Sequence, residues 1–302
     1  MNEKEFAMTD DLRLGAGGVG VERTAADLAS AEGLHAFFQT FDATRLAGIE
    51  AQFANINAAI GMQPPPAANR RQRHEMRGVH HRLTKWGSVK IREAVALADL
   101  AGSVAEGDAL HIHDVCGGKG AVALYVAFLR QQAGRVTTGT CWELRADQQQ
   151  GHEFVGSWLG LTAPPDFRSV DIAHADLARA PDGKTHALAK HACGPLTDAV
   201  FANVAALPAH EKPDVTAVMT CCHSYLQGTE PFWPASVPLT DRQEIARRAD
   251  PQKEPDPYVR DVVGVVCRRV VDALRAKMMG ADLREALPFG KESQRNHVLS
   301  KA

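Results

Sequence analysis

The segment from His111 to Gly120, HIHDVCGGKG, constrains this chain more than any other part of the sequence. It predicts a strand that runs into a glycine-rich turn, and the turn opens a helix that begins at Ala121. A second predicted strand ends in a carboxylate at Glu143. Strand, tight turn, helix and a following strand-end acid are together the parts of a nucleotide-cofactor cradle.

The details of the turn exclude two common phosphate-binding motifs. A Walker loop would need glycine at His113 and serine or threonine at Gly120, and a dinucleotide fingerprint would need glycine at Cys116. The remaining pattern is acid-x-G-x-G-x-G, which is typical of S-adenosylmethionine methyltransferases. Asp114, Gly118 and Gly120 fit this pattern, with Cys116 in place of its first glycine.

Composition narrows the class of protein. The chain has 302 residues, 45% of them apolar, and a net charge of −2, so any nucleic-acid binding must come from a local basic patch. Six cysteines without a C-x-x-C pair indicate a reducing compartment. No apolar run reaches the roughly 18 residues of a membrane span, and the acidic N-terminus is unlike a presequence. We therefore expect a soluble, intracellular protein without membrane contact, with the cytoplasm as the expected compartment and the nucleus or an organelle left open.

The chain divides into three expected parts. Residues 1–23 are polar and glycine-rich and are expected to be disordered, whereas residues 24–107 form a helical N-terminal region. This region includes a basic arm, Asn69 to Arg92, with eight Lys or Arg residues, one Glu and a net charge of +7. Residues 108–302 form the predicted catalytic domain.

Within this domain predicted strands alternate with helices, which favours a parallel sheet with helices on both faces. The expected strands are Ala109–Asp114, Val136–Glu143, Phe167–Ile172, Thr185–Lys190 and Asp214–Cys221. The expected helices are Ala121–Gln132, Ala146–Leu159 and Leu196–Leu207. A charged loop, 230–256, then precedes a longer helix, Pro257–Met279, and two short strands, Leu283–Pro288 and His297–Lys301.

Polar clusters follow three of these strands. They are Asp171–Leu177, Lys190–Asp198 and Cys221–Tyr225, and the carboxyl ends of parallel strands share one crevice. Their cysteines and histidines are zinc-type ligands. However, adjacent cysteines depart from the usual C-x₂₋₄-C spacing, so we expect no metal site.

These same strings carry a family resemblance. The chain resembles the eukaryotic tRNA 2′-O-methyltransferases that modify the fourth nucleotide of the acceptor stem, and the related class I methyltransferase domain. That family has G-x-G-K-G, D-I-x-H-x-D-L, K-H-x-C-G-x-x-T-D and C-C-H-H. The matching segments here are Gly118–Gly120, Asp171–Leu177, Lys190–Asp198, Cys221–His223, Val263–Asp272 and Asn296–Leu299, over about residues 108–302.

Three features depart from the family pattern. Cys116 replaces a glycine, Ser224 replaces a histidine, and residues 1–107 lack the N-terminal zinc fingers. The resemblance still implies a Rossmann-like, seven-stranded class I methyltransferase sheet that uses S-adenosyl-L-methionine. It further implies methylation of a ribose 2′-hydroxyl in RNA, with tRNA or rRNA as the substrate.

The expected site residues fall into three groups. Cofactor binding is expected from Asp114, Cys116, Gly118, Gly120, Glu143, Ile172 and Asp176. The candidate groups for handling the hydroxyl proton are Lys190, His191 and His223, which the residues alone do not rank. RNA binding is expected from Arg70, Arg71, Arg73 and Arg77.

Two alternatives stay open at this point. The acceptor could be a protein or a small molecule instead of RNA. The chain could also be an assembly factor that keeps the fold without catalysis, and Cys116 favours this reading because its side chain could crowd the cofactor.

Overall fold

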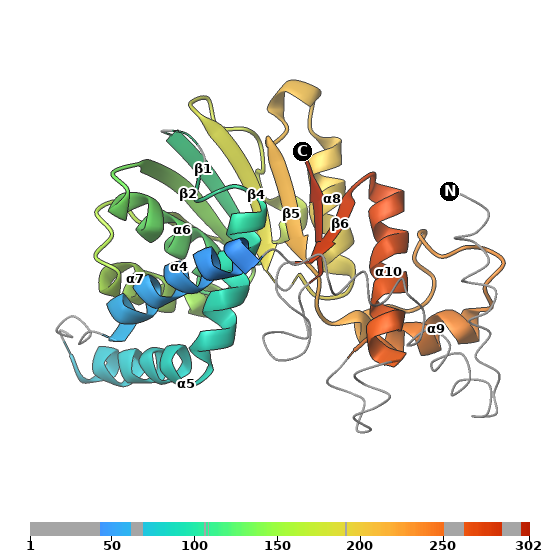
Figure 1. The fold of residues 1–302 in the computed structure, drawn as a ribbon, viewed down its shortest axis with the longest axis horizontal. Helices are drawn as coiled ribbons and strands as arrows, with labels where there is room; N and C mark the ends of the chain where they lie inside the picture. Colours follow the sequence, from blue (N-terminus) through green and yellow to red (C-terminus); the bar gives the residue numbers. More distant parts are fainter. Residues whose placement is uncertain are drawn as a thin grey trace.

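The computed structural model describes residues 43–61, 69–105, 107, 109–190, 192–250, 263–285 and 297–302. These residues form a seven-stranded sheet in the order β3-β2-β1-β4-β5-β7-β6 (Figure 1). The strands are β1 (Ala109–Val115), β2 (Val136–Glu143), β3 (Asp166–Ser169), β4 (Lys184–Lys190), β5 (Val215–Met219), β6 (Asp282–Glu285) and β7 (His297–Lys301). The expected Rossmann-like class I methyltransferase fold is confirmed.

The directions and the order of the strands indicate where a ligand is expected to bind. The first five strands pair in parallel, and β7 runs antiparallel to both β5 and β6. The strand order reverses at β1, which has β2 on one side and β4 on the other. Ligands of open α/β sheets bind outside the carboxyl ends of the strands at such a reversal.

Helices cover both faces of the sheet (Figure 1). One face carries α4 (Ala43–Gly61), α5 (Arg70–Leu100), α6 (Ala121–Gln132) and α7 (Gln149–Trp158), and the other carries α8 (Pro195–Ala206) and α10 (Gly264–Met279). Side chains alternate along each strand, so Leu188 and Ala217 enter the first core while Ala189 and Val218 enter the second. The central strands therefore contribute apolar side chains to the cores on both faces of the sheet.

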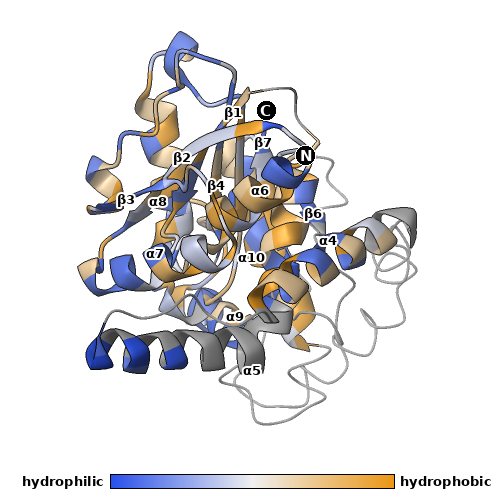
Figure 2. Ribbon diagram, turned by 90° about the vertical axis from the view of Figure 1, so that its left-hand side faces the viewer, coloured by the Kyte–Doolittle hydropathy of each residue, from blue (hydrophilic) through white to orange (hydrophobic). Residues whose placement is uncertain are grey.

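Helix α5 joins the basic arm to the core. Ile91, Val95 and Leu97 near its C-terminal end are fully or almost fully buried, and they share one core cluster with α4 and with β1. Its first turns are exposed and strongly hydrophilic (Figure 2). The C-terminal part of α5 and the sheet therefore share one hydrophobic core.

Two strands are shorter than expected. β3 ends at Ser169, and Asp171 caps a 3-10 turn, η2 (Ile172–His174), by accepting a hydrogen bond from the amide of Ala173 at 3.0 Å. β5 ends at Met219. An Asx-type cap satisfies the backbone locally, so it replaces the ladder hydrogen bonds of a strand.

The charged loop after β5 contains a helix that sequence analysis missed, α9 (Leu239–Arg248). Ile245 and Ala246 on this helix are buried in a third cluster with Trp233 and Phe232. Only two apolar side chains of α9 enter this cluster, so the periodic pattern is too weak to mark the helix in the sequence.

Some expectations lie outside the described residues. They include the disorder of 1–23, the first part of the helical region expected over 24–107, the start of the helix expected at 257, and all of 286–296. Among the described residues no helix is long and apolar enough to cross a membrane.

Candidate functional site

The glycine-rich turn is fixed to the helix that follows it. One oxygen of Asp114, Oδ2, accepts hydrogen bonds from the amides of Val122 at 3.0 Å and Ala123 at 3.1 Å, in the first turn of α6. The other oxygen, Oδ1, is buried and has no hydrogen-bond partner among the described residues. Burial raises the pKa of Asp114 to about 6, against the opposing effect of the Ala123 amide. A positive charge nearby would therefore stabilise the ionised form.

Three residues of the turn have left-handed backbone conformations: Cys116 (φ 53°), Gly118 (φ 59°) and Gly120 (φ 71°). This conformation explains why the motif prefers glycine at all three positions. A Cβ added to Gly118 would meet nothing within 4 Å, whereas a Cβ added to Gly120 would collide with the ring of His152. The turn thus has open space above Gly118 and a packed layer behind Gly120.

Cys116 adopts the strained conformation without being glycine, and it is the one such residue in the part of the chain that the structure describes. Its side chain is half-buried and packs beside Trp142 on the cluster that also contains Ile172. Burial raises the pKa of the Cys116 thiol to about 12, so the thiol stays neutral. It therefore adds bulk but no charge to the turn.

Glu143 ends β2 beside the turn, as the sequence predicts. Its Oε2 accepts a hydrogen bond from the amide of Gly118 at 2.9 Å, and its Oε1 accepts one from the amide of Arg145 at 3.1 Å. A carboxylate has about four acceptor positions, so both oxygens can still accept from hydroxyl groups. After β3, Ile172 is buried, and Asp176 is exposed and accepts a hydrogen bond from the amide of Ala178 at 3.1 Å.

Lys190 ends β4 between the carboxyl ends of β1 and β5. Burial lowers the pKa of Lys190 to about 8, partly offset by the charges of Glu93 and Asp114. Glu93, on α5, is itself almost fully buried and pairs with Lys90 at 3.0 Å. The structure therefore brings together Asp114, Lys190 and the C-terminal part of α5, whereas the predicted base His191 lies outside the described residues.

His223 is fully buried and belongs to a polar network. Its Nε2 lies 2.8 Å from Oδ1 of Asp272, and Oδ2 of the same carboxylate lies 2.9 Å from Nδ1 of His297 and accepts from Thr220 at 3.0 Å. The Nδ1 of His223 is buried without a hydrogen-bond partner among the described residues. The side chain of His223 is enclosed by protein atoms. Its catalytic role stays a prediction.

Sequence reasoning missed several partners of the site. Asp272 and His297 lie in segments that carry the family resemblance, so those segments were the available signal. His152 carried no such signal. Its ring nitrogens lie 3.2 Å from the carbonyl oxygen of Lys119 and 2.8 Å from that of Pro165, a contact that only folding creates.

The four predicted RNA-binding arginines, Arg70, Arg71, Arg73 and Arg77, are exposed in the first turns of α5. Two other basic residues of the arm serve the fold. Arg92 donates to Glu50 at 2.8 and 3.2 Å and lies 4.4 Å from the ring centroid of Phe53, and Lys90 is held by Glu93. Among the basic residues of the arm whose side chains the structure describes, the exposed arginines therefore lie in the first turns of α5.

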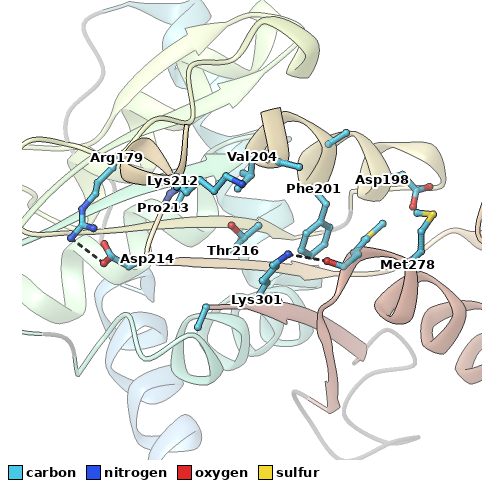
Figure 3. Close-up of a pocket in the computed structure, with 15 residues that line it drawn as sticks. Arg179, Asp198, Phe201, Val204, Lys212, Pro213, Asp214, Thr216, Met278 and Lys301 are labelled. Carbon is cyan, nitrogen blue, oxygen red and sulfur yellow. Dashed lines mark hydrogen bonds and ion pairs between the residues drawn. The ribbon is translucent and has the colours of Figure 1, made fainter. Parts of the chain in front are cut away.

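A separate cavity of about 540 Å³ lies between α8, α10 and the end of β7 (Figure 3). Apolar side chains such as Phe201 and Met278 line it, and an ion pair between Arg179 and Asp214 at 3.1 Å stands at its rim. None of the predicted site residues lines this cavity. The strand-end chemistry therefore defines the candidate site, and this cavity does not.

His113 gives a pH-dependent stability prediction. Its Nε2 lies 3.0 Å from the carbonyl oxygen of Ala178, and the indole of Trp142 donates to its Nδ1 at 3.1 Å, which fits a neutral ring. Burial lowers the pKa of His113 from 6.5 to about 4. Below pH 6.5 the unfolded chain gains a proton that the folded chain does not, so the free energy of unfolding falls by roughly 3 kcal/mol down to pH 4.

Asp114 contributes the opposite trend, because its raised pKa makes the folded chain gain a proton below about pH 6. We therefore expect the effect in a difference: the free energy of unfolding of wild type minus that of His113→Gln, from urea titrations at several pH values. This difference should decline as the pH is lowered from 7 to 4. A difference that stays constant over this range would show that His113 titrates normally.

Part of the chain matches a known protein family in sequence. Residues 89–229 match a family model described as a methyltransferase domain. No curated protein matches the chain in sequence.

Several solved structures are similar in part. One, described as an S-adenosyl-L-methionine-dependent methyltransferase from Methanococcus maripaludis, is 9% identical over 80% of this chain and 96% of its own, with a TM-score of 0.43. The S-adenosylhomocysteine-bound methyltransferase PaMTH1 from Podospora anserina is 11% identical over 86% and 95%, with a TM-score of 0.38. A protein described as a sarcosine dimethylglycine methyltransferase from Galdieria sulphuraria is 17% identical over 44% of this chain, with a TM-score of 0.33, and the match spans 48% of that protein.

Proposed function

We propose that this protein is an S-adenosylmethionine-dependent methyltransferase whose acceptor is a ribose hydroxyl of RNA. The observation that carries the cofactor assignment is the turn at Gly118, which has open space above it and lies between the carboxylates of Asp114 and Glu143. Two carboxylates beside an open glycine turn suit a ligand that carries both ribose hydroxyls and positive charge.

The residues of the cradle have separable roles. S-adenosylmethionine supplies an electrophilic methyl group on a cationic sulfur. Gly118 leaves room for the ligand, Glu143 offers its remaining acceptor positions to the ribose hydroxyls, and Ile172 provides an apolar surface for the adenine. Asp114 fixes the turn to α6 and contributes an unpaired carboxylate oxygen, which favours a cationic ligand.

Lys190 is our choice for the group that receives the proton of the acceptor hydroxyl. A ribose hydroxyl is a weak nucleophile, so a nearby base must accept its proton as the methyl group is transferred. With a pKa of about 8, roughly one Lys190 side chain in ten is neutral at pH 7, compared with far fewer for an exposed lysine. The positive charge of a bound cofactor would lower this pKa further.

The geometry of α5 supports a macromolecular acceptor. Glu93 on this helix influences the pKa of Lys190, whereas Arg77 and Arg70 lie 16 and 23 residues earlier. At 1.5 Å per residue these arginines lie up to about 24–35 Å along the helix from Glu93. A small molecule cannot bridge this span, whereas the phosphates of an RNA strand can.

The cofactor assignment is tested with Gly118→Ala. Because nothing lies within 4 Å of the new methyl group, we expect stability to fall only by the left-handed backbone cost of about 1–2 kcal/mol. Binding of S-adenosylmethionine, measured by calorimetry, should weaken at least about tenfold because the methyl group enters the cradle. Wild-type protein that binds NAD instead, or a variant with unchanged affinity, would contradict the assignment.

The RNA assignment is tested by salt titration. Replacement of Arg70, Arg71 and Arg73 by Ala should make the slope of log affinity against log salt shallower by about 2, at 0.7 per lost phosphate contact on single strands. Cofactor binding should not change. Arg168→Ala with Arg284→Ala is the matched control, because both are exposed arginines on the edge strands β3 and β6.

The site of methylation separates RNA from the alternatives. Digestion of the methylated RNA should yield 2′-O-methyl nucleosides. Methylated bases would overturn the ribose assignment, and a methylated protein in place of RNA would favour the protein-modifying alternative. Failure to bind S-adenosylmethionine at all would favour the inactive assembly factor.

A further inference from the structure

Three cysteine side chains converge at the carboxyl ends of β4 and β5. Cys193 lies in the loop between β4 and α8, and Cys221 and Cys222 follow β5. Their three Sγ atoms lie within 4.8 Å of one another, and those of Cys193 and Cys221 are 2.7 Å apart. Cys221 is buried, while Cys193 and Cys222 are half-buried, so the cluster borders solvent.

Strand pairing produces this convergence. Lys190 pairs with Met219 where β4 and β5 lie side by side, so the residues that follow each strand emerge together. The sequence does not indicate that these thiols meet, because Cys193 and Cys221 are 28 residues apart. The sequence analysis predicted no metal site because Cys221 and Cys222 are adjacent. In the structure both thiols nevertheless lie close to Cys193, so this spacing does not prevent them from sharing a ligand.

The Cys193 loop is held firmly on both sides of the thiol. The hydroxyl of Thr197 donates to the carbonyl oxygen of Ala192 at 2.7 Å, and the buried guanidinium of Arg275 donates to that of Gly194 at 2.7 Å. Arg275 is itself paired with Asp198 at 3.1 Å. Loops fixed in this way preorganise their side chains for a ligand.

We propose that Cys193, Cys221 and Cys222 bind one Zn²⁺ ion through three thiolates, with the fourth position left to water. A tetrahedral ion with Zn–S bonds of about 2.3 Å needs sulfur atoms about 3.8 Å apart, a spacing that small shifts of these thiols provide. Three protein ligands and one open position are typical of zinc sites outside purely structural ones.

The charge balance of the site is consistent with a bound cation. Three thiolates and one Zn²⁺ carry a net charge of −1, and Cys221 lies close enough to Lys190 to influence its pKa. Hydrogen bonds with Cys193 and Cys222, together with burial, raise the pKa of Cys221 well above its usual range.

The test uses the purified full-length protein, kept reduced with a non-thiol reductant, and Co²⁺ as a spectroscopic probe for the site. We expect one equivalent of Co²⁺ to bind with thiolate-to-cobalt charge-transfer absorption, and Zn²⁺ to displace it. Cys193→Ser and Cys222→Ser should each weaken binding more than about 100-fold, because each removes a ligand directly.

Cys267→Ala is the matched control, since Cys267 is a buried thiol on α10 outside the cluster, and it should bind Co²⁺ like wild type. Thermal unfolding of each apo variant checks the fold, and the two half-buried positions are chosen because they tolerate substitution better than Cys221. Equal Co²⁺ affinity in all variants, or a Cys193–Cys221 disulfide in protein that binds no metal when reduced, would overturn the proposal.

Discussion

Lys190→Met should reduce the rate of methyl transfer by about 10²–10⁴-fold while leaving the binding of S-adenosylmethionine nearly unchanged. The substitution keeps the length and apolar stem of the side chain but removes the amine that accepts the hydroxyl proton. Lys190 is half-buried at the carboxyl end of β4, and methionine is similar in size, so we expect the variant to fold. The measurement is single-turnover transfer to RNA, together with calorimetric titration of the cofactor.

The matched control for this prediction is Lys184→Met at the other end of the same strand. Lys184 is half-exposed and pairs with Asp214 at 3.1 Å, so its loss should leave the transfer rate intact. An equal loss of transfer rate in both variants would indicate that the rate depends on the total charge of β4 and not on the position of Lys190. A Lys190→Met variant with wild-type transfer would remove Lys190 from the mechanism.

Gly120→Ala should destabilise the fold and abolish cofactor binding. Two costs add here: the left-handed backbone at φ 71° costs about 1–2 kcal/mol with a side chain. The collision of the new methyl group with the His152 ring costs roughly 1–3 kcal/mol more, because that ring is held by two backbone carbonyls. Urea unfolding and cofactor titration of the variant measure the two effects.

Gly134→Ala separates these costs. Gly134 also has a left-handed backbone, with φ 68°, but a Cβ there would meet nothing within 4 Å. It should therefore lose only the backbone part and keep full cofactor affinity. An equal loss in the free energy of unfolding for both variants would show that the collision with His152 contributes nothing to the destabilisation by Gly120→Ala.

Periodicity determined most of the fold from sequence. The central strands β1, β2, β4 and β5 alternate along the chain with helices of ordinary length, so this alternation alone predicts a parallel sheet covered on both faces. The prediction failed where local hydrogen bonding competed with strand pairing, as at Asp171, and where a helix has a weak apolar pattern, as in α9. At Asp171 a local cap outweighs strand pairing, whereas α9 is stabilised by tertiary burial of Ile245 and Ala246.

Sequence by itself also determined the chemistry of the turn, because a strand, left-handed glycines and a strand-end acid are each encoded over a few neighbouring residues. It could not determine which distant groups share a site. The pairing of His223 with Asp272, the layer of His152 behind Gly120 and the meeting of Cys193 with Cys221 and Cys222 join residues 28 to 49 positions apart. Such contacts depend on strand order and on the packing of helices against the sheet, which no local pattern specifies.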